Sequence, residues 1–427
     1  MELNQIHHLF LESSGISTDT RNIKQGSLFF ALKGPNFNGN TFAHKALKTG
    51  ARYAIIDEAV YPEDQRFVLV DNVFETLQKL ASFHREQLGL CIIALTGSNG
   101  KTTTKELIHA VLKPHFKTVA TVGNLNNHIG VPLTLLSMTA DTEIGIVEMG
   151  ANHAKEIALL CEIAKPNMGY ITNFGKAHLE GFGSEEGVVK AKSELYDYLK
   201  AHSGLIILNS EDAQQVAQVG AYEKTFTFSE TSETNVNVKF RSIQPFLSVE
   251  IQEIAIKTQL IGRYNFHNIA AALAIGIYFK LAPLQLQKGI EGYIPTNNRS
   301  QIIQKNSNEI LLDAYNANPS SMEVALENFI GIQNQHKLAI LGDMFELGTS
   351  SSKEHLGLIN KAISTKACQF CFVGSHFFEH QKPHPNLLFF KTFQDLRQHL
   401  EQTTIANTSI LIKGSRGMAL ERVLELI

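Results

Sequence analysis

The chain has 427 residues, of which 44% are hydrophobic and 19% are charged, and its formal net charge is -3. This length suits about three domains with substantial cores, and the near balance of charge gives no push toward nucleic-acid binding. Any anionic ligand must therefore be met by a local group of residues.

Four cysteines in so long a chain cannot form a disulfide framework, which favours a reducing cytoplasm. The first residues, MELNQIHHLFLESSG, lack a basic segment followed by an apolar one, and no run of about 18 apolar residues occurs. We therefore expect a cytoplasmic protein without membrane insertion, and we expect it to be a monomer that binds no nucleic acid.

The N-terminal region combines short β-like runs with at least one helical pattern. The β-like runs are Ser27–Leu32, Tyr53–Ile56 and Phe67–Val70, and the helical pattern covers Thr41–Thr49. We assign residues 1–83 to a small α/β domain.

From Cys91 onward, apolar strand patterns alternate with helical patterns. The pairs are Ile92–Leu95 with a helix from Lys101, Ile144–Met149 with Ala154–Ala164, and Met168–Ile171 with Gly187–Lys200. Such alternation predicts a mainly parallel sheet covered by helices, with ligands at the carboxyl ends of its strands. Alternating runs between Lys224 and Leu260 predict an antiparallel patch on this sheet, and a helix covers about Phe266–Leu281. We assign residues 84–295 to this central domain.

A turn-rich stretch, YIPTNNRSQ at Tyr293–Gln301, precedes a third alternating region. Its strand patterns are EILLD, KLAILG, FCFVG, LLFF and SILIKG, and a helical pattern follows each of them except FCFVG. We assign residues 296–427 to a C-terminal Rossmann-like α/β domain. The predicted fold is therefore α/β with three domains, which pack against each other as jointed parts because neither joint is a long flexible linker.

Two patterns resemble metal sites but favour plain structure. Cys368 and Cys371 have CxxC spacing, yet they lie in an apolar run without a second pair, which predicts a buried strand. His376, His380 and His384 recur every four residues, but Pro383 and Pro385 would break a helix there and predict a loop.

The segment CIIALTGSNGKTTTKELIHAVL, Cys91–Leu112, runs from a strand pattern through a glycine turn into an amphipathic helical pattern. Such a turn presents backbone N–H groups to an anion, and the helix dipole adds favourable potential. In a phosphate loop the lysine reaches the β and γ phosphates, and the next hydroxyl sits on Mg²⁺. The flanking patterns favour this interpretation over an ordinary glycine turn. The loop residues are Gly97, Ser98, Asn99, Gly100, Lys101, Thr102 and Thr103.

A phosphate loop alone does not balance a triphosphate beside an anionic acceptor. A helix N-terminus contributes about 0.3 to 1 kcal/mol toward one charge, whereas unit charges about 4 Å apart interact by about 4 kcal/mol at an effective dielectric constant of about 20. Divalent metal is therefore needed, with ligands at strand ends beside the loop. Glu148 ends one strand pattern and His178 follows the next. The alternatives are a surface acid at Glu148 and a histidine without metal at His178, because Mg²⁺ prefers oxygen ligands.

Motifs along nearly the whole chain resemble those of the Mur ligases, the ATP-dependent amide-forming enzymes of peptidoglycan precursor synthesis. The motifs are TGSNGKTTT, GNLNNHIGVPLT, EMGANHAKEI, AHLEGFGS, AKSELY, GRYNFHNIAAALA, DAYNANPSSM, LGDMFELG and IKGSRGM. The family's own form of the loop accounts for Leu95, where the general pattern Gly-x-x-x-x-Gly-Lys-Thr has glycine. YNANP and LGDMFELG indicate the member that adds D-alanyl-D-alanine (D-Ala-D-Ala) to UDP-N-acetylmuramoyl-tripeptide (UDP-MurNAc-tripeptide).

The resemblance implies catalytic and metal-binding roles. Lys101, Glu148, His178 and Lys192 become catalytic residues, and Thr102, Glu148, His178 and Lys192 become ligands of two Mg²⁺ ions. Lys192 takes the position of a carbamylated lysine, whose CO₂ adduct is an anionic ligand; its pattern alone suggests a solvated helix lysine.

The resemblance also implies contacts with ATP and substrate. Asn268 is expected beside adenine, Arg299 at phosphate, and Asp313 and Asn316 at ribose and adenine. Bland alternatives remain open: a capped turn at Asp313, and a surface salt bridge at Arg21 in place of a bidentate contact with diphosphate. The residues expected to bind UDP are Ser17, Asp19, Thr20 and Arg21, and those expected to hold peptide are Asn126, Asn127, Ser415 and Arg416.

The sequence departs from the family pattern in two places. Asn298 stands where glycine commonly precedes the arginine, which puts the loop geometry near Arg299 in question. Leu312-Asp313-Ala314-Tyr315-Asn316 lacks one carboxylate and one hydroxyl of the usual Asp-Asp-Ser/Thr-Tyr-Asn.

The predicted reaction transfers the γ-phosphoryl group of ATP to the tripeptide carboxylate, and the amine of D-Ala-D-Ala then attacks the acyl phosphate. Closure between the central and C-terminal domains should complete the site. Related alternatives are the tripeptide-forming Mur ligase and folylpolyglutamate synthetase. A nucleotide switch or a nucleic-acid motor is the alternative from another class; Asn-Lys-x-Asp and a basic stripe, which would favour these, are missing from the sequence.

Overall fold

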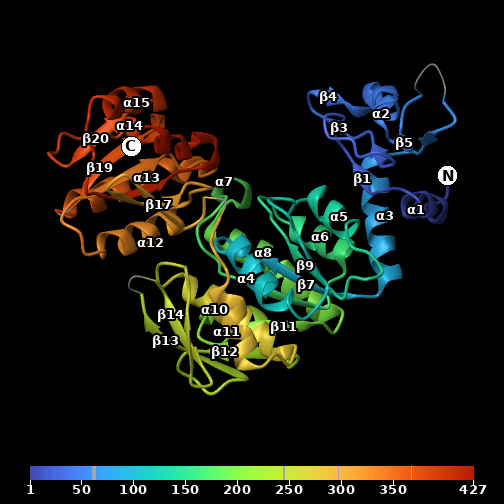
Figure 1. Cartoon of the computed structure of the whole chain (residues 1–427), viewed down its shortest axis with the longest axis horizontal. Coiled ribbons are helices and arrows are strands. Elements are labelled where there is room, and N and C mark those ends of the chain that lie inside the picture. The colour runs from blue at the N-terminus through green and yellow to red at the C-terminus, as the bar shows by residue number, and fades with distance from the viewer. Residues whose placement is uncertain (60–63, 244–245, 297, 367) are drawn as a thin grey trace.

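The computed structural model describes residues 1–59, 64–243, 246–296, 298–366 and 368–427. Within these ranges, three larger β-sheets follow one another along the chain, and each lies in its own unit with its helices (Figure 1). We call these the N-terminal, central and C-terminal units. The predicted α/β class with three units is confirmed.

The N-terminal unit contains a four-stranded parallel sheet in the order β1-β2-β5-β6 and a small hairpin of β3 and β4. Two α-helices and one 3₁₀ turn accompany it. The bounds are α1 (Leu3–Leu11), β1 (Ile16–Ser17), β2 (Leu28–Phe30), β3 (Lys33–Gly34), β4 (Phe37–Asn38), η1 (Gly39–Phe42), α2 (Ala43–Thr49), β5 (Tyr53–Ile56) and β6 (Phe67–Leu69). The three predicted strands and the predicted helix are confirmed; α1 was not predicted.

Helix α3 (Val73–Leu88) joins the N-terminal unit to the central unit. Its first turn is capped by the Asn72 side chain, and Gly89 ends it in a left-handed conformation. Leu77 of α3 belongs to one apolar cluster with Phe30 of the N-terminal sheet and Val147 of the central sheet. The predicted boundary between residues 83 and 84 falls inside this helix, so the division into domains stays a prediction.

The central unit is built on a nine-stranded sheet in the order β15-β14-β13-β12-β11-β10-β7-β9-β8. Its strands are β7 (Cys91–Thr96), β8 (Thr118–Ala120), β9 (Ile144–Glu148), β10 (Met168–Ile171), β11 (Leu205–Asn209), β12 (Thr225–Ser229), β13 (Val236–Ser242), β14 (Ser248–Ile251) and β15 (Ile254–Lys257). The pairs from β8 to β13 are parallel, and β13, β14 and β15 are antiparallel. The antiparallel patch is therefore confirmed for three strands, whereas β12, near its predicted start, pairs in parallel.

The helices of the central unit lie between these strands and after them. They are α4 (Lys101–Leu112), α5 (Gly130–Leu135), α6 (Glu156–Ala164), α7 (Leu179–Phe182), α8 (Glu185–Ala201), α9 (Ala213–Val219), α10 (Asn265–Tyr278) and α11 (Pro283–Glu291). The register pairs Leu95 of β7 with Glu148 of β9, and Thr96 with Ile171 of β10. Because parallel neighbours end at the same edge of a sheet, the segments after these strands meet there.

The C-terminal unit has a six-stranded sheet in the order β16-β17-β21-β18-β19-β20, in which only the β16–β17 pair is antiparallel. Its strands are β16 (Gln301–Lys305), β17 (Asn308–Asp313), β18 (Lys337–Gly342), β19 (Gln369–Val373), β20 (Leu387–Phe390) and β21 (Ser409–Lys413). Its helices are α12 (Pro319–Ile330), η2 (Gly348–Ser350), α13 (Ser351–Ser364), α14 (Ser375–Phe378), α15 (Phe393–Glu401), η3 (Arg416–Met418) and η4 (Leu420–Glu425). The expected last helix is thus a pair of 3₁₀ turns. Strand β16 was not predicted, and Asn297 of the turn-rich stretch lies outside the described residues.

The two patterns that resemble metal sites are part of this fold. Cys371 is buried in β19 as expected, and all four cysteines are free thiols. The expectation of a loop is wrong for His376, which lies in α14. In the part of the chain that the structure describes, no group of three or more His, Cys, Asp or Glu side chains is arranged to hold a metal ion, and no helix is both long and apolar enough to span a bilayer.

Candidate functional site

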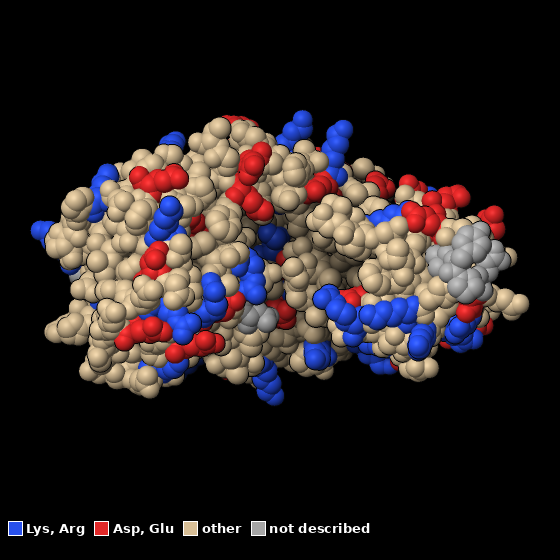
Figure 2. All heavy atoms as spheres, turned by 90° about the horizontal axis from the view of Figure 1, so that it is seen from above, with Lys and Arg blue, Asp and Glu red and all other residues tan. Residues whose placement is uncertain are grey.

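A cavity of about 710 Å³ lies at the carboxyl ends of β7, β9 and β10, between the central and C-terminal units. Figure 2 shows a hollow in the middle of the molecule, with charged side chains on its rim. Most of the predicted site residues line the cavity. They are Ser98, Asn99, Gly100, Lys101, Thr102, Thr103, Asn126, Asn127, Glu148, His178, Asn268, Arg299, Asp313, Asn316 and Arg416.

The phosphate loop requires both of its glycines. Gly97 has φ 138°, and a Cβ there would come within 2.0 Å of the Thr172 Oγ1 atom. Gly100 has φ 79°, and a Cβ there would come within 2.6 Å of the Asn268 Oδ1 atom. Only glycine combines these backbone angles with such close approach, so the loop packs tightly against the segment that follows β10 and against α10.

Lys101 lies over the loop that precedes it. Its Nζ donates hydrogen bonds to the carbonyl oxygens of Gly97 at 2.6 Å and Ser98 at 3.3 Å. Burial lowers the pKa of Lys101 to about 8; the charge of Arg299 lowers it further and that of Glu148 opposes the shift. The ammonium is therefore held at the place where an anion would restore its ordinary pKa.

Glu148 places a carboxylate beside the loop, and one of its oxygens has no partner. Its Oε1 accepts a hydrogen bond from Asn126 Nδ2 at 2.8 Å, whereas Oε2 is buried without a hydrogen-bond partner among the described residues. Glu148 is 1% exposed, so its alternative as a surface acid is wrong. An unpaired buried carboxylate oxygen is costly unless a cation meets it. The site therefore fits Mg²⁺, which takes few protein ligands and completes its shell with phosphates and water.

His178, just before α7, and Lys192 of α8 both lie near Phe182, at 6.3 Å between ring centres and 5.1 Å from Nζ to the ring centre. His178 lines the cavity, and its Nδ1 lies 2.5 Å from Glu346 Oε2 of the C-terminal unit. Lys192 is 1% exposed and does not line the cavity. Its Nζ donates to the carbonyl oxygen of Ala151 at 3.1 Å. Burial holds the pKa of Lys192 well below its usual value, so the alternative of a solvated helix lysine is wrong.

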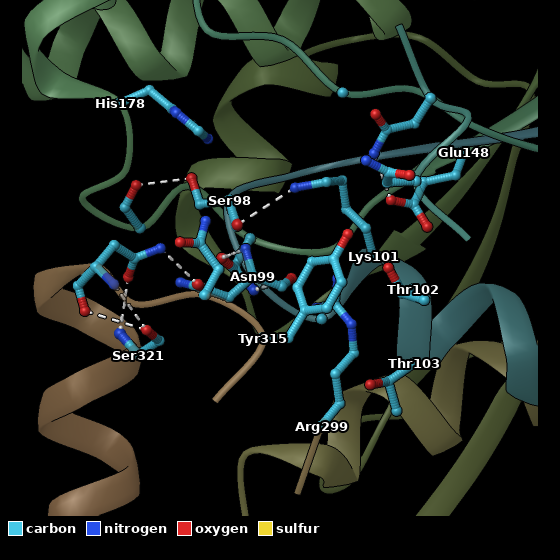
Figure 3. A pocket seen from close by; sticks show the side chains of 18 of the residues that line it. Ser98, Asn99, Lys101, Thr102, Thr103, Glu148, His178, Arg299, Tyr315 and Ser321 are labelled. Atoms are coloured by element: carbon cyan, nitrogen blue, oxygen red, sulfur yellow. Dashed lines mark hydrogen bonds between the residues drawn. The ribbon is translucent and has the colours of Figure 1, made fainter. Parts of the chain in front are cut away.

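Arg299 faces the cavity from the segment before β16 and stacks on Tyr315, with its guanidinium carbon 3.7 Å from the ring centre (Figure 3). Asn298 has φ 56° and accepts the Tyr315 N–H at its carbonyl at 3.2 Å. Asparagine tolerates this left-handed conformation better than most residues, so it takes the place of the usual glycine there. Cation–π stacking fixes the direction of the guanidinium.

Asp313 ends β17 and is held from two sides. Its Oδ2 lies 2.5 Å from Lys413 Nζ, and its Oδ1 accepts the Ser300 N–H at 3.1 Å. Lys413 also donates to the Asn316 carbonyl at 3.2 Å. Sequence reasoning missed Lys413 and Tyr315, although both lie within quoted motifs. A lysine that ends an apolar strand pattern was the available signal for Lys413.

The start of α12 contacts the phosphate loop directly. Asn318 Nδ2 donates to Asn99 Oδ1 at 2.8 Å, and Ser320 Oγ accepts the Lys176 N–H at 2.7 Å. Figure 3 shows that the first turn of α12, which carries Ser321, lies beside the part of the phosphate loop that carries Asn99. The central and C-terminal units therefore share one cavity wall.

Several predicted residues use their side chains within the fold. Asn268 accepts from Thr104 Oγ1 at 3.0 Å and donates to Asn265 at 2.9 Å. Asn127 accepts two N–H groups at the start of α5. Ser415 is 2% exposed, and its Oγ accepts the Phe345 N–H at 2.9 Å, away from the cavity lining. Arg416 reaches the cavity and pairs with Glu421 at 2.7 Å.

The residues expected to bind UDP lie outside the cavity lining, in the N-terminal unit. Arg21 is exposed and pairs with Asp19 at 2.6 Å, which lowers the pKa of Asp19 to about 2. Ser17 Oγ donates to the Asp19 carbonyl at 3.2 Å, and Thr20 is half-buried between Asp19 and Arg21. The surface salt bridge is thus what Arg21 forms without a ligand.

A phosphate loop between β7 and α4, an unpaired carboxylate oxygen at the neighbouring strand end and polar side chains from a second unit define a phosphate-loop nucleotide-binding protein. Three family models match the chain: the Mur ligase family catalytic domain at residues 12–85, the Mur ligase middle domain at 95–276 and the Mur ligase glutamate ligase domain at 298–416.

Known proteins match over almost the full length. UDP-N-acetylmuramoyl-tripeptide--D-alanyl-D-alanine ligase of Bacillus subtilis is 35% identical over 96% of this chain and 92% of its own. The Escherichia coli protein of the same name is 32% identical over 96% and 92%. A crystal structure of MurF from Acinetobacter baumannii has a TM-score of 0.87 at 28% identity, and covers 99% of this chain and 97% of its own. MurF ligase from Thermotoga maritima in complex with ADP has a TM-score of 0.85 at 25% identity, and covers 98% and 97%. The chain belongs to the Mur ligase family.

Proposed function

We propose that the chain is an ATP-dependent, ADP-forming ligase that joins D-Ala-D-Ala to UDP-MurNAc-tripeptide and yields the UDP-linked pentapeptide of peptidoglycan synthesis. The observation that carries this proposal is the nearly full-length similarity to ligases of that name. The hydrogen bond between Asn99 of the phosphate loop and Asn318 of the YNANP segment supports it, because it joins the two segments at the cavity. The enzyme acts in the cytoplasm as a monomer and binds no nucleic acid. Its domains are residues 1–83, 84–295 and 296–427.

The chain's own residues bind and orient ATP. N–H groups of the loop Gly97–Thr103 and the Lys101 ammonium surround the phosphates, and Arg299, braced by Tyr315, adds a second positive charge. Asp313, which is held by Lys413, accepts hydrogen bonds from the ribose hydroxyls. Asn268 and Asn316 face adenine. A carboxylate oxygen of the tripeptide attacks the γ-phosphorus, and ADP leaves. The amine of D-Ala-D-Ala then attacks the acyl carbon, phosphate leaves, and the amine gives up a proton.

Mg²⁺, when bound, neutralises the negative charge that gathers on the phosphates during the transfer. Thr102 and Oε2 of Glu148 would hold one ion, and His178 and Lys192 would hold a second. Burial favours the uncharged form of the Lys192 amine, and this form can add to CO₂, forming an N–C bond and releasing one proton. The resulting carbamate is an anion, which suits a metal ligand better than an ammonium does.

The remaining predicted residues bind the other parts of the substrate. Arg21 exchanges its contact with Asp19 for the diphosphate, and Ser17, Asp19 and Thr20 hold the uridine end. The peptide is met by Asn126, Asn127 and Arg416, with Ser415 supporting the turn that carries Arg416.

Phosphate release with different acceptors tests the proposal. With UDP-MurNAc-tripeptide and ATP, release should require D-Ala-D-Ala and should not occur with a diamino acid or with glutamate. Release with a diamino acid and UDP-linked dipeptide would reassign the chain to the tripeptide-forming ligase. Separate reactions with lysine or diaminopimelate as the third peptide residue identify the natural acceptor.

A further inference from the structure

A contact between two units lies at the edge of the cavity. His178, just before α7 of the central unit, places its Nδ1 2.5 Å from Oε2 of Glu346, which follows β18 of the C-terminal unit. The backbone joins in, because the Glu180 N–H donates to the Glu346 carbonyl at 3.2 Å. The contact is a close nitrogen–oxygen pair and not an aligned hydrogen bond, because Nδ1 has no hydrogen-bond partner among the described residues. A small rotation of the ring would align a proton on Nδ1 with the carboxylate.

Both residues of this pair have an unusual backbone. His178 has φ 53° and Glu346 has φ 61°, in the left-handed region that few residues other than glycine adopt; histidine is found there more often than most, whereas glutamate is not. Such strain persists only where surrounding structure enforces it, and it collects at functional sites. Apolar packing supplies the enforcement, since Leu179 of α7 belongs to the same buried cluster as Met344 and Leu347 of the C-terminal unit. Figure 1 shows α7 beside the C-terminal unit.

A histidine that ligates a metal nearly always donates its second ring N–H to a carboxylate or carbonyl, which fixes its tautomer and its direction. Here Glu346 occupies the Nδ1 side, which leaves Nε2 as the ring nitrogen available to the cavity that His178 lines (Figure 3). Resting on the function proposed above, we infer that Glu346 is a positioning residue, which holds His178 in the Nδ1–H tautomer with Nε2 presented to Mg²⁺.

The inference couples metal binding to the docking of the C-terminal unit. Glu346 belongs to the C-terminal unit, whereas His178 and Glu148 belong to the central unit. The His178 ligand is therefore oriented only while the two units are in contact. Mg²⁺ should in turn favour the docked arrangement, because coupling between two binding events is reciprocal.

Glu346→Ala and Glu346→Gln test the inference, with Glu354→Gln as a matched control. Glu354 also joins the two units, through Lys176 Nζ at 3.5 Å, but does not contact His178. Mn²⁺ binding is measured by electron paramagnetic resonance in the presence of a non-hydrolysable ATP analogue, with ¹⁵N-labelled histidine to detect ring coordination. Long-range ¹H–¹⁵N spectra of the metal-free proteins report the His178 tautomer.

The wild-type protein should show histidine coordination of Mn²⁺ and the Nδ1–H tautomer. Glu346→Ala should weaken Mn²⁺ binding by roughly 10- to 100-fold and lose the preferred tautomer. Glu346→Gln retains an acceptor oxygen and should keep the tautomer with a smaller loss of affinity. Glu354→Gln should match the wild type in both measurements.

Wild-type Mn²⁺ affinity and tautomer in Glu346→Ala, in a variant whose circular dichroism and unfolding temperature show that it is folded, would overturn the inference. So would the lack of histidine coordination in the wild type. An equal loss in Glu354→Gln would assign the effect to general loosening of the interface and would overturn it as well. Ligation of D-Ala-D-Ala by the wild type is measured separately, so failure of the proposed function is recognised independently of these results.

Discussion

Charged side chains at the cavity and in the N-terminal unit differ in burial and in pairing. In the cavity, Glu148 is 1% exposed with an unpaired oxygen, and Lys413 is fixed against Asp313. In the N-terminal unit, the side chain of Arg21 is 83% exposed and, among the described residues, pairs with its near neighbour Asp19 alone. Buried charges are expensive to leave unpaired, whereas surface ion pairs contribute little. Substitutions in the cavity should therefore change catalysis strongly, and substitutions at Arg21 should change only substrate affinity.

Replacing Lys101 by alanine should produce the largest effect, a loss of at least about a thousandfold in ATP turnover, because a charge directed at the transferred phosphoryl group is lost. Lys101→Arg keeps the charge in a different shape and should retain part of the activity. Phosphate release measures both variants. Near-normal turnover by Lys101→Ala would remove the loop from the mechanism and would break the contrast between the two regions.

Replacing Lys192 by alanine should lower activity by about a hundredfold or more, in the range for removal of one charged group from an active site. Added short-chain carboxylates should restore part of it, because a small anion can enter the space that the side chain leaves. Activity is measured over a carboxylate series, with Lys190→Ala of the same helix as control. No rescue at any concentration would count against a carbamate at this position.

The pH dependence should sharpen the same contrast. Burial lowers the pKa of Lys101 to about 8, so the free enzyme loses this charge above that pH and kcat/KM for ATP should fall about tenfold per pH unit. Lys101→Arg should move the decline out of the measured range. Because the unfolded chain keeps a proton that the folded chain has lost, stability without nucleotide should rise with pH between about 8 and the ordinary value of 10.5. A flat kcat/KM profile would show that Lys101 stays charged.

Replacing Arg21 by alanine should have the smallest effect, a several-fold rise in KM for the UDP-linked substrate with kcat and stability nearly unchanged. Arg66→Ala is a matched control, since Arg66 pairs with Asp64 at 2.7 Å in the same unit but lies outside the segment expected to bind UDP. Steady-state kinetics compares the two variants. A large fall in kcat for Arg21→Ala would show that the N-terminal unit takes part in the chemical steps.

Local sequence predicted those parts of the fold and site that short segments determine. The strand β7, the glycine loop and the helix α4 were found because apolar spacing, glycine and a helix start occur together in Cys91–Leu112. Strand β16 was missed because QIIQK is a short edge strand directly after turn residues. The predicted boundary between residues 83 and 84 falls inside α3 because helix periodicity around Phe83 was not followed, and the division into domains stays a prediction.

Contacts between distant segments could not be predicted in the same way. Glu346 touches His178, and Asn318 touches Asn99, only because two units dock against each other. Docking depends on the packing of apolar surfaces such as Leu179 against Leu347, which no local pattern encodes. The family resemblance named many of the cavity residues, but it did not indicate which of them brace one another, as Lys413 braces Asp313.

The continuous helix α3 sets a limit on how this protein can be shortened. Its apolar face is shared, since Leu80 and Ala81 lie in one buried cluster with Val131 of α5 and Leu160 of α6. A truncated chain that starts at Cys91 would expose these apolar residues of α5 and α6 to water and would promote aggregation. The N-terminal unit therefore cannot be removed together with α3. A minimal ATP-binding fragment must keep α3, because this helix covers apolar residues of α5 and α6.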